Sequence, residues 1–201
     1  MTTFDRLLEQ LANQLNTLSK RSQVAFYWAC ASALQPEFRA WAAHRGASET
    51  LLNQSLSIAA DFASTGAAPE RFALGRLLEA LEASTPPGES PDEFPATNAQ
   101  DCWICADVCI RVLVDGAYSP GSAIWYALEP VVTEASVRCF GVSQVGSGES
   151  EEAYMQVIQR QPVVVAALDY CRWAINFLGQ KPSPDADDIA LVRMRADALR
   201  P

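Results

Sequence analysis

Residues 24–31 read VAFYWACA, a run in which every residue is apolar. A helix on the surface of a fold carries its apolar residues on one stripe, whereas a helix that is apolar on all sides is buried. The run therefore predicts a central buried helix over residues 21–34. Such a helix has to be surrounded by other elements.

The rest of the chain repeats apolar residues at helical spacing, with turn residues between the repeats. Three consecutive valines at 163–165 favour a strand locally, but no second strand is predicted to pair with them, so they are assigned to a helix. The sequence predicts an all-α fold, a single-domain bundle of about eight or nine helices over residues 1–201.

Proline and capping signals set the expected helix ends. Pro36 is expected to end the central helix, and Pro130 to kink or break a later one, because proline lacks the N–H that a helix interior uses. Thr97 and Gln100 form a capping-box pattern that is expected to begin another helix.

The composition indicates where the protein is located in the cell and which kinds of partner it is not expected to bind. The first residues carry acids and amides where a secretory signal would need a basic flank and an apolar stretch, and no apolar run approaches the length of a membrane span. Six cysteines without a secretory context indicate reduced thiols, so a cytoplasmic location is expected, with no membrane partner. A net charge of −9 argues against binding to nucleic acid.

The negative charge is concentrated in the middle of the chain. Residues 79–169 carry fourteen acidic and three basic residues, a net charge of −11, while the flanking segments are each +1. Two connections there combine acids with turn residues and are the predicted partner-binding surface. Its residues are Glu89, Asp92, Glu93, Phe94, Glu149, Glu151 and Glu152. The alternative is that these acids only complement helix N-termini and keep the protein soluble.

Cys102, Cys105 and Cys109 suggest either core packing or a metal or redox site. At helical spacing they share one stripe with Ala106 and Val112, which favours the core, where a free cysteine behaves as a small apolar residue. His44 is the sole histidine and lies far from them in the sequence. We therefore expect no metal site and no cofactor.

Asp107, Arg111 and Asp115 lie one helical turn apart, which predicts a ladder of ion pairs. Asp169 and Arg172 are expected to form a salt bridge between helices. A helical enzyme built around either aspartate is the alternative, but no phosphate loop, nucleophile elbow or zinc-protease motif is present. We expect a protein that is not an enzyme and has no catalytic residues.

Three stretches carry a resemblance to a known family: AFYWACASALQPEFRAWA (25–42), SPDEFP (90–95) with the helix after it, and the Glu- and Gln-bearing region near residue 155. They resemble the YjaG-like family of uncharacterised bacterial helical proteins. The length and layout are also similar to helical immunity proteins of bacterial polymorphic toxin systems. The resemblance implies an all-helical bacterial protein whose partner is a cognate toxin, expected to be basic. A homodimer is compatible with the sequence.

Reversing the charge of Glu89, Asp92 and Glu93 to lysine should slow association with a basic partner, because like charges then meet during the encounter. The loss should be larger at low salt, where screening is weak. Association rates measured by surface plasmon resonance at two salt concentrations test this. Equal rates for the variant and the unchanged protein would contradict it.

Overall fold

The computed structural model describes residues 2–86, 94–141 and 150–199. Within these ranges it contains nine α-helices, one short 3-10 helix (η1) and no strand, which confirms the predicted fold class. The elements are α1 (Thr3–Asn16), α2 (Lys20–Arg45), α3 (Thr50–Thr65), α4 (Arg71–Ala83), α5 (Phe94–Val114), η1 (Pro120–Ala123), α6 (Ile124–Phe140), α7 (Glu151–Ile158), α8 (Pro162–Gly179) and α9 (Ala186–Asp197).

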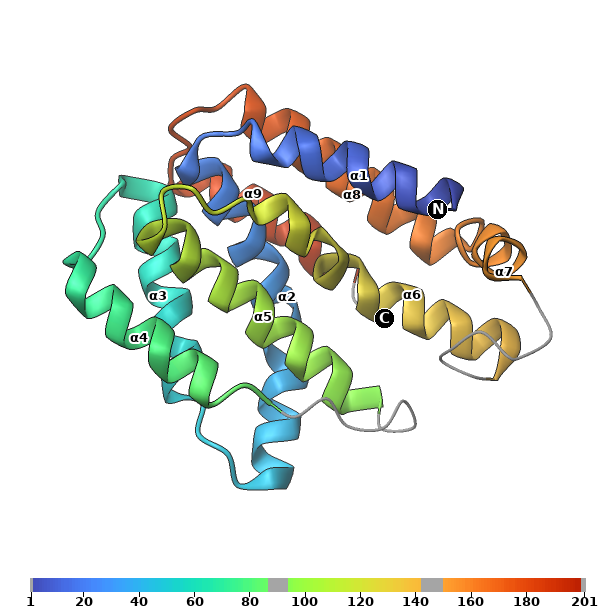
Figure 1. The fold of residues 1–201 in the computed structure, drawn as a ribbon, viewed down its shortest axis with the longest axis horizontal. Helices are drawn as coiled ribbons and strands as arrows, with labels where there is room; N and C mark the ends of the chain where they lie inside the picture. Colours follow the sequence, from blue (N-terminus) through green and yellow to red (C-terminus); the bar gives the residue numbers. More distant parts are fainter. Residues whose placement is uncertain (1, 87–93, 142–149, 200–201) are drawn as a thin grey trace.

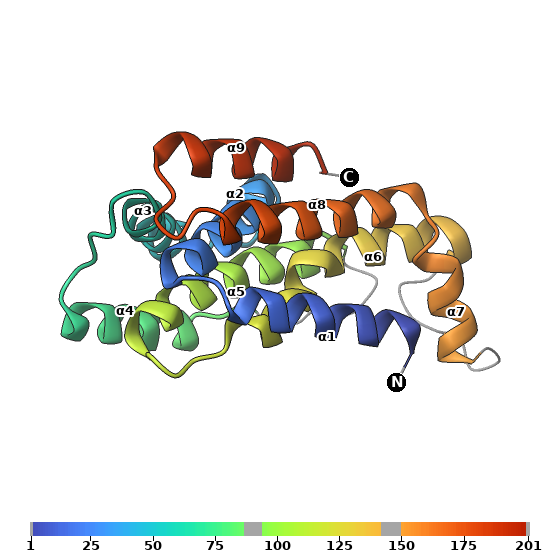
Figure 2. The same ribbon diagram turned by 90° about the horizontal axis from the view of Figure 1, so that it is seen from above.

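Helix α2 forms the centre of the fold (Figure 1). All of residues 22–34 are buried, which confirms the prediction made from VAFYWACA. Helix α5 makes the most extensive contact with α2, and α3, α9, α8 and α6 cover other parts of it. Figure 2 shows α9 on one side of the molecule and α1 on the opposite side, with α2 and α5 between them.

The prediction that Pro36 ends this helix is wrong, because α2 continues to Arg45. Pro36 is exposed, whereas Phe38 and Ala42 are buried, so the second half of α2 still packs one face against the core. That packing offsets the backbone hydrogen bond that the proline removes. For the same reason α6 passes through Pro130 without a break, since Val131 and Ala135 continue its buried face.

The helix start predicted at Thr97 is also wrong. Helix α5 begins at Phe94, so Thr97 and Gln100 lie inside its first turns and do not form its cap. Gln100 instead donates from Nε2 to the carbonyl oxygen of Pro86, 3.4 Å away.

Side chains in the first turn of α2 donate hydrogen bonds to the C-terminal carbonyl groups of other helices. The Arg21 guanidinium donates to the carbonyl oxygens of Ala63 and Ser64 in the last turn of α3, and to that of Pro184 before α9. The Ser22 hydroxyl donates to carbonyl oxygens at the end of α8, and the Gln23 side-chain amide donates to carbonyl oxygens at the end of α1. The last carbonyl groups of a helix have no hydrogen-bond partner within that helix. These bonds therefore remove the free-energy cost of burying the carbonyl groups without a partner.

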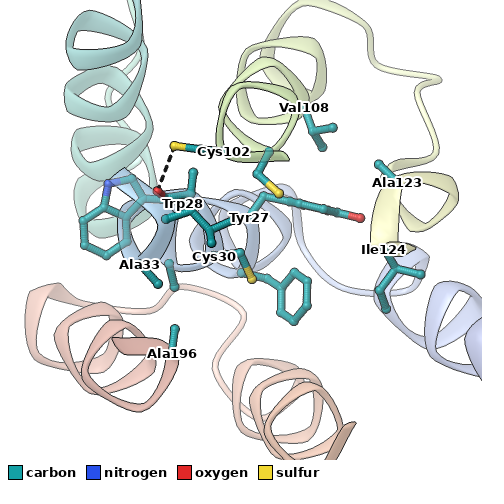
Figure 3. Packing of buried hydrophobic residues seen from close by; sticks show 14 of the residues in the cluster. Tyr27, Trp28, Cys30, Ala33, Cys102, Val108, Ala123, Ile124 and Ala196 are labelled. Carbon is teal, nitrogen blue, oxygen red and sulfur yellow. Dashed lines mark hydrogen bonds between the residues drawn. The ribbon is translucent and has the colours of Figure 1, made fainter. Parts of the chain in front are cut away.

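Tyr27 connects α2 to η1. It is buried, and its hydroxyl donates to the carbonyl oxygen of Pro120 at 2.5 Å. Figure 3 shows Tyr27 reaching from α2 toward Ala123 and Ile124. Next to this bond, the backbone N–H of Gly121 donates to Asn16 Oδ1 at 2.7 Å. Together they hold η1 against α1 and α2.

None of the helices in the described part of the chain combines the length and apolar character that a bilayer span would require.

Replacing Gly121 with alanine should destabilise the protein by about 2–4 kcal/mol, because the new methyl group would overlap packed backbone. A Cβ atom at this position would lie 2.3 Å from the carbonyl oxygen of Ala12. Urea unfolding followed by circular dichroism measures the change.

Gly75→Ala is the matched control. Gly75 lies inside α4, and a Cβ atom there has no neighbour within 4 Å. Its substitution should stabilise the protein by about 0.5–1 kcal/mol, since alanine has the higher helix propensity. If the two variants unfold at the same urea concentration, η1 is not packed as described.

Candidate functional site

A polar cleft of about 400 Å³ opens between α4, α5 and the η1–α6 segment. This volume lies within the range of ordinary ligand pockets. The cleft is lined by Glu82, Thr85, Trp103, Ile104, Asp107, Val108, Arg111, Tyr118, Ser122, Ala123 and Tyr126. It is the candidate functional site, and we call it the α4–α5 cleft.

Arg111 joins the two helices that line this cleft. Its Nε lies 2.5 Å from Asp107 Oδ2, one turn earlier on α5, and its Nη2 lies 2.6 Å from Glu82 Oε1 on α4. The predicted pair between Asp107 and Arg111 is thereby confirmed. Asp115 takes no part in this network, since its Oδ1 accepts the backbone N–H of Ala117 instead.

The Asp107 carboxyl group lies in the shielded wall of the cleft. Burial raises its pKa above the ordinary value, while the hydrogen bond and the charge of Arg111 act in the opposite direction. The side chain of Asp107 is 14% exposed and that of Glu82 50%, so one wall of the cleft is shielded from water and the other is open.

Aromatic side chains form the rest of the cleft. Tyr118 and Tyr126 are half-buried, and burial raises the pKa of Tyr118. Trp103 is almost fully buried, stacks on Phe38 with ring centroids 5.5 Å apart, and donates from Nε1 to the carbonyl oxygen of Leu81 at 3.2 Å. These contacts hold the end of α4 against α5.

The cysteines of α5 lie on its opposite face. Cys102, Cys105 and Cys109 are each buried against α2, which confirms the prediction that they belong to the core. Cys102 Sγ donates to the carbonyl oxygen of Ala31, as Figure 3 shows, and burial raises the pKa of all three thiols. Among the described residues, no three His, Cys, Asp or Glu side chains are grouped so that they could hold a metal ion.

A pair of carboxyl groups between α5 and α6, one buried and one half-buried, was missed by the sequence analysis. Asp101 is 1% exposed and hydrogen bonds to Glu129, which also accepts a hydrogen bond from Trp125. Burial and the neighbouring carboxyl raise the pKa of Asp101 to about 9, so the two groups share a proton at neutral pH. Asp101 precedes Cys105 by one turn, and this position on the buried stripe was the available signal.

Most of the predicted partner-binding residues lie outside the described residues: Glu89, Asp92, Glu93, Glu149 and the side chain of Phe94. Glu151 is exposed in the first turn of α7. Glu152 is engaged with α1, because its carboxylate accepts the backbone N–H and the hydroxyl of Thr3 at 3.2 and 3.1 Å. Glu151 is therefore directed to solvent, whereas Glu152 holds α7 against the start of α1.

The remaining candidates lie apart from the cleft. Asp169 is exposed and pairs with Arg172 at 2.9 Å on the same helix, so the predicted bridge between helices is wrong. The spacing of three residues already allowed that local pair. His44 is exposed in the last turn of α2, far from the cleft.

The fold and the cleft define a class of protein, an all-α domain wrapped around one buried helix. No family model and no curated protein sequence matches the chain. Among solved structures it is similar to the crystal structure of a DUF416 family protein from Shewanella baltica OS155, with a TM-score of 0.70 and 12% sequence identity over 92% of each chain. DUF416 is the YjaG-like family, so the resemblance noted in the sequence is confirmed as a likeness of fold.

Replacing Asp101 with asparagine should stabilise the protein above pH 5. The native state holds a proton on Asp101 up to about pH 9, whereas the unfolded chain releases it near its ordinary pKa of 3.8. Stability of the unchanged protein therefore falls as pH rises between these values. Asparagine carries no such proton and keeps a donor for Glu129.

Urea unfolding at pH 5 and pH 8 measures this effect. The advantage of Asp101→Asn should grow by up to about 1.4 kcal/mol per pH unit. Asp61→Asn, at an exposed position on α3, is the control and should show no such growth. Parallel pH profiles for Asp101→Asn and the unchanged protein would rule out the shared proton.

Proposed function

We propose that this chain is a protein-binding protein that neutralises a basic partner, of the kind of a cognate toxin, through an acidic surface at the C-terminal end of α4. The observation that carries this proposal is the run of acids from this end of α4 onward, since residues 79–93 hold five acidic residues and no basic one. Glu82 and Asp107 line the α4–α5 cleft, and the connection between the two helices adds Glu89, Asp92 and Glu93 by sequence.

The charge of the central segment is not spread evenly over the surface. Asp101 and Glu134 are buried, the first in the proton-sharing pair and the second beside Arg138, so neither is presented to solvent. Glu79 and Glu82 are exposed on α4 and follow each other by one turn. Arg71 and Arg76 are exposed nearer the start of the same helix, so the acidic surface is confined to its C-terminal end. An acidic surface raises the rate at which an oppositely charged protein is captured.

We infer a binding role in preference to catalysis. Asp107 is the perturbed acid of the cleft, and it is bound to Arg111. General acid or base chemistry needs a group that is within reach of a substrate proton and has a partner to complete the reaction. The contacts of Asp107 support a role in holding α4 against α5.

Co-expression with the product of the adjacent reading frame tests the proposal. We expect a stable complex and restored growth of cells in which that product is toxic. The double variant Glu79→Lys and Glu82→Lys should lower the association rate about tenfold at low salt, because two of the steering charges are reversed. Stopped-flow association kinetics provide the measurement.

The double variant Glu9→Lys and Asp61→Lys is the control. Both residues are exposed, on α1 and α3, and each double variant changes the formal net charge from −9 to −5. The control should associate at nearly the unchanged rate. Equal losses in both variants would show that only total charge matters, and the absence of any complex would overturn the proposed function.

A further inference from the structure

A second pocket lies between α2, α6, α8 and α9, and it shares no lining residue with the α4–α5 cleft. Each of the four helices lines it with one alanine: Ala33, Ala127, Ala167 and Ala196. Figure 3 shows Ala33 of α2 and Ala196 of α9 facing each other. Small side chains that meet at one place leave about 40 Å³ of free space, about three times what one water molecule needs. We call this space the apolar pocket.

Tyr170 of α8 lines the apolar pocket with a hydroxyl group that is not satisfied. The residue is 7% exposed, and no described residue forms a hydrogen bond of ordinary geometry with its hydroxyl group. Its polar neighbours are the thiols of Cys30 and Cys171, which line the same pocket and are weak donors and acceptors. A buried hydroxyl group without a partner costs free energy, so an acceptor brought by a ligand would remove that cost.

The chemistry of the lining selects the kind of occupant. A buried water molecule needs two to four polar partners, whereas the side chains of this pocket are aliphatic apart from Tyr170 and the two thiols. A charged ligand would lose its hydration without gaining an opposite charge, because no ionisable acid or base lines the pocket. A neutral molecule with an aliphatic body and one polar atom meets both conditions.

The two thiols favour reversible binding. Burial raises the pKa of Cys30 to about 12 and also raises the pKa of Cys171. Both sulfur atoms therefore stay protonated at neutral pH, and a protonated thiol is a poor nucleophile. A ligand would be held by contact with the lining and by one hydrogen bond, with no covalent step.

The pocket reaches the surface beside the end of α9. Ala127 and Leu199 line it and are half-buried, whereas Ala33 and Ala167 are fully buried. A small molecule can therefore enter between α6 and the end of α9 and meet Tyr170 inside.

We propose that the apolar pocket binds a small neutral carbonyl compound with a short aliphatic chain, whose oxygen accepts a hydrogen bond from the Tyr170 hydroxyl group. This inference goes beyond the proposed function. It concerns a different place in the fold, and its test needs no protein partner.

Titration with 2-butanone, followed by ¹³C methyl NMR, tests the pocket directly. Val131 and Leu199 line the pocket, and Leu74 of α4 does not. We expect the methyl signals of Val131 and Leu199 to shift saturably, with a dissociation constant in the millimolar range, and those of Leu74 to stay in place. Propionate has the same number of non-hydrogen atoms but carries a charge, so it should bind at least about tenfold more weakly.

Two matched pairs of variants locate the binding. Tyr170→Phe should weaken the binding of 2-butanone about fivefold, because it removes the donor and keeps the ring. Tyr126→Phe, on the half-buried tyrosine of the α4–α5 cleft, should leave it unchanged. Ala167→Leu should fill the pocket and abolish binding, whereas Ala166→Leu, at the exposed neighbouring position of α8, should have no effect.

Circular dichroism checks that each variant keeps the fold, and Tyr170→Phe decides the assignment if Ala167→Leu does not fold. The absence of a saturable shift, equal affinities for 2-butanone and propionate, or equal effects of the two tyrosine variants would each overturn the proposed site. The proposed function fails separately, when no partner complex forms in the co-expression experiment.

Discussion

The burial of α2 is the constraint on which the rest of the structure depends. A helix satisfies its own interior backbone groups, so it can be enclosed by apolar neighbours on every side, but the neighbours must then end somewhere near it. Three of them, α1, α3 and α8, end at its first turn. There the side chains of Arg21, Ser22 and Gln23 donate hydrogen bonds to the last carbonyl oxygens of these helices. The same continuous segment of α2 therefore forms the buried centre and supplies the hydrogen bonds that end its neighbouring helices.

The position of the candidate site follows from how α5 meets α2. Helix α5 turns Cys102, Cys105 and Cys109 toward α2, where small side chains allow a close approach. With 3.6 residues per turn, Asp107 and Arg111 then lie away from α2 and toward α4. Asp107 and Arg111 therefore lie together in the groove that α4 borders, and the cleft is a consequence of how the core packs.

The sequence predicted those parts of the structure that depend on local periodicity: the helical class, the buried run at residues 24–31 and the inward face of the α5 cysteines. It failed at Pro36, where packing on both sides overrode a local stop signal, and at Thr97, where the helix begins three residues before the local start signal. It also could not supply the contacts between Glu82 and Arg111 or Asp101 and Glu129, because each joins two helices whose relative placement is set by the whole core.

Helix α4 is the element that combines exposure with charge. It buries a single stripe of three leucines, Leu74, Leu77 and Leu81, and carries Phe72, which is 76% exposed, on its outer side. An element with so few buried contacts contributes little to global stability and can adjust at small cost. The bridge from Glu82 to Arg111 and the bond from Trp103 to Leu81 fix its end, however, so the cleft stays formed. The last turn of α4 is therefore held on α5, whereas its first turn, with Phe72 exposed, can adjust. A partner that binds α4 would order only the adjustable end, which reduces the entropic cost of binding.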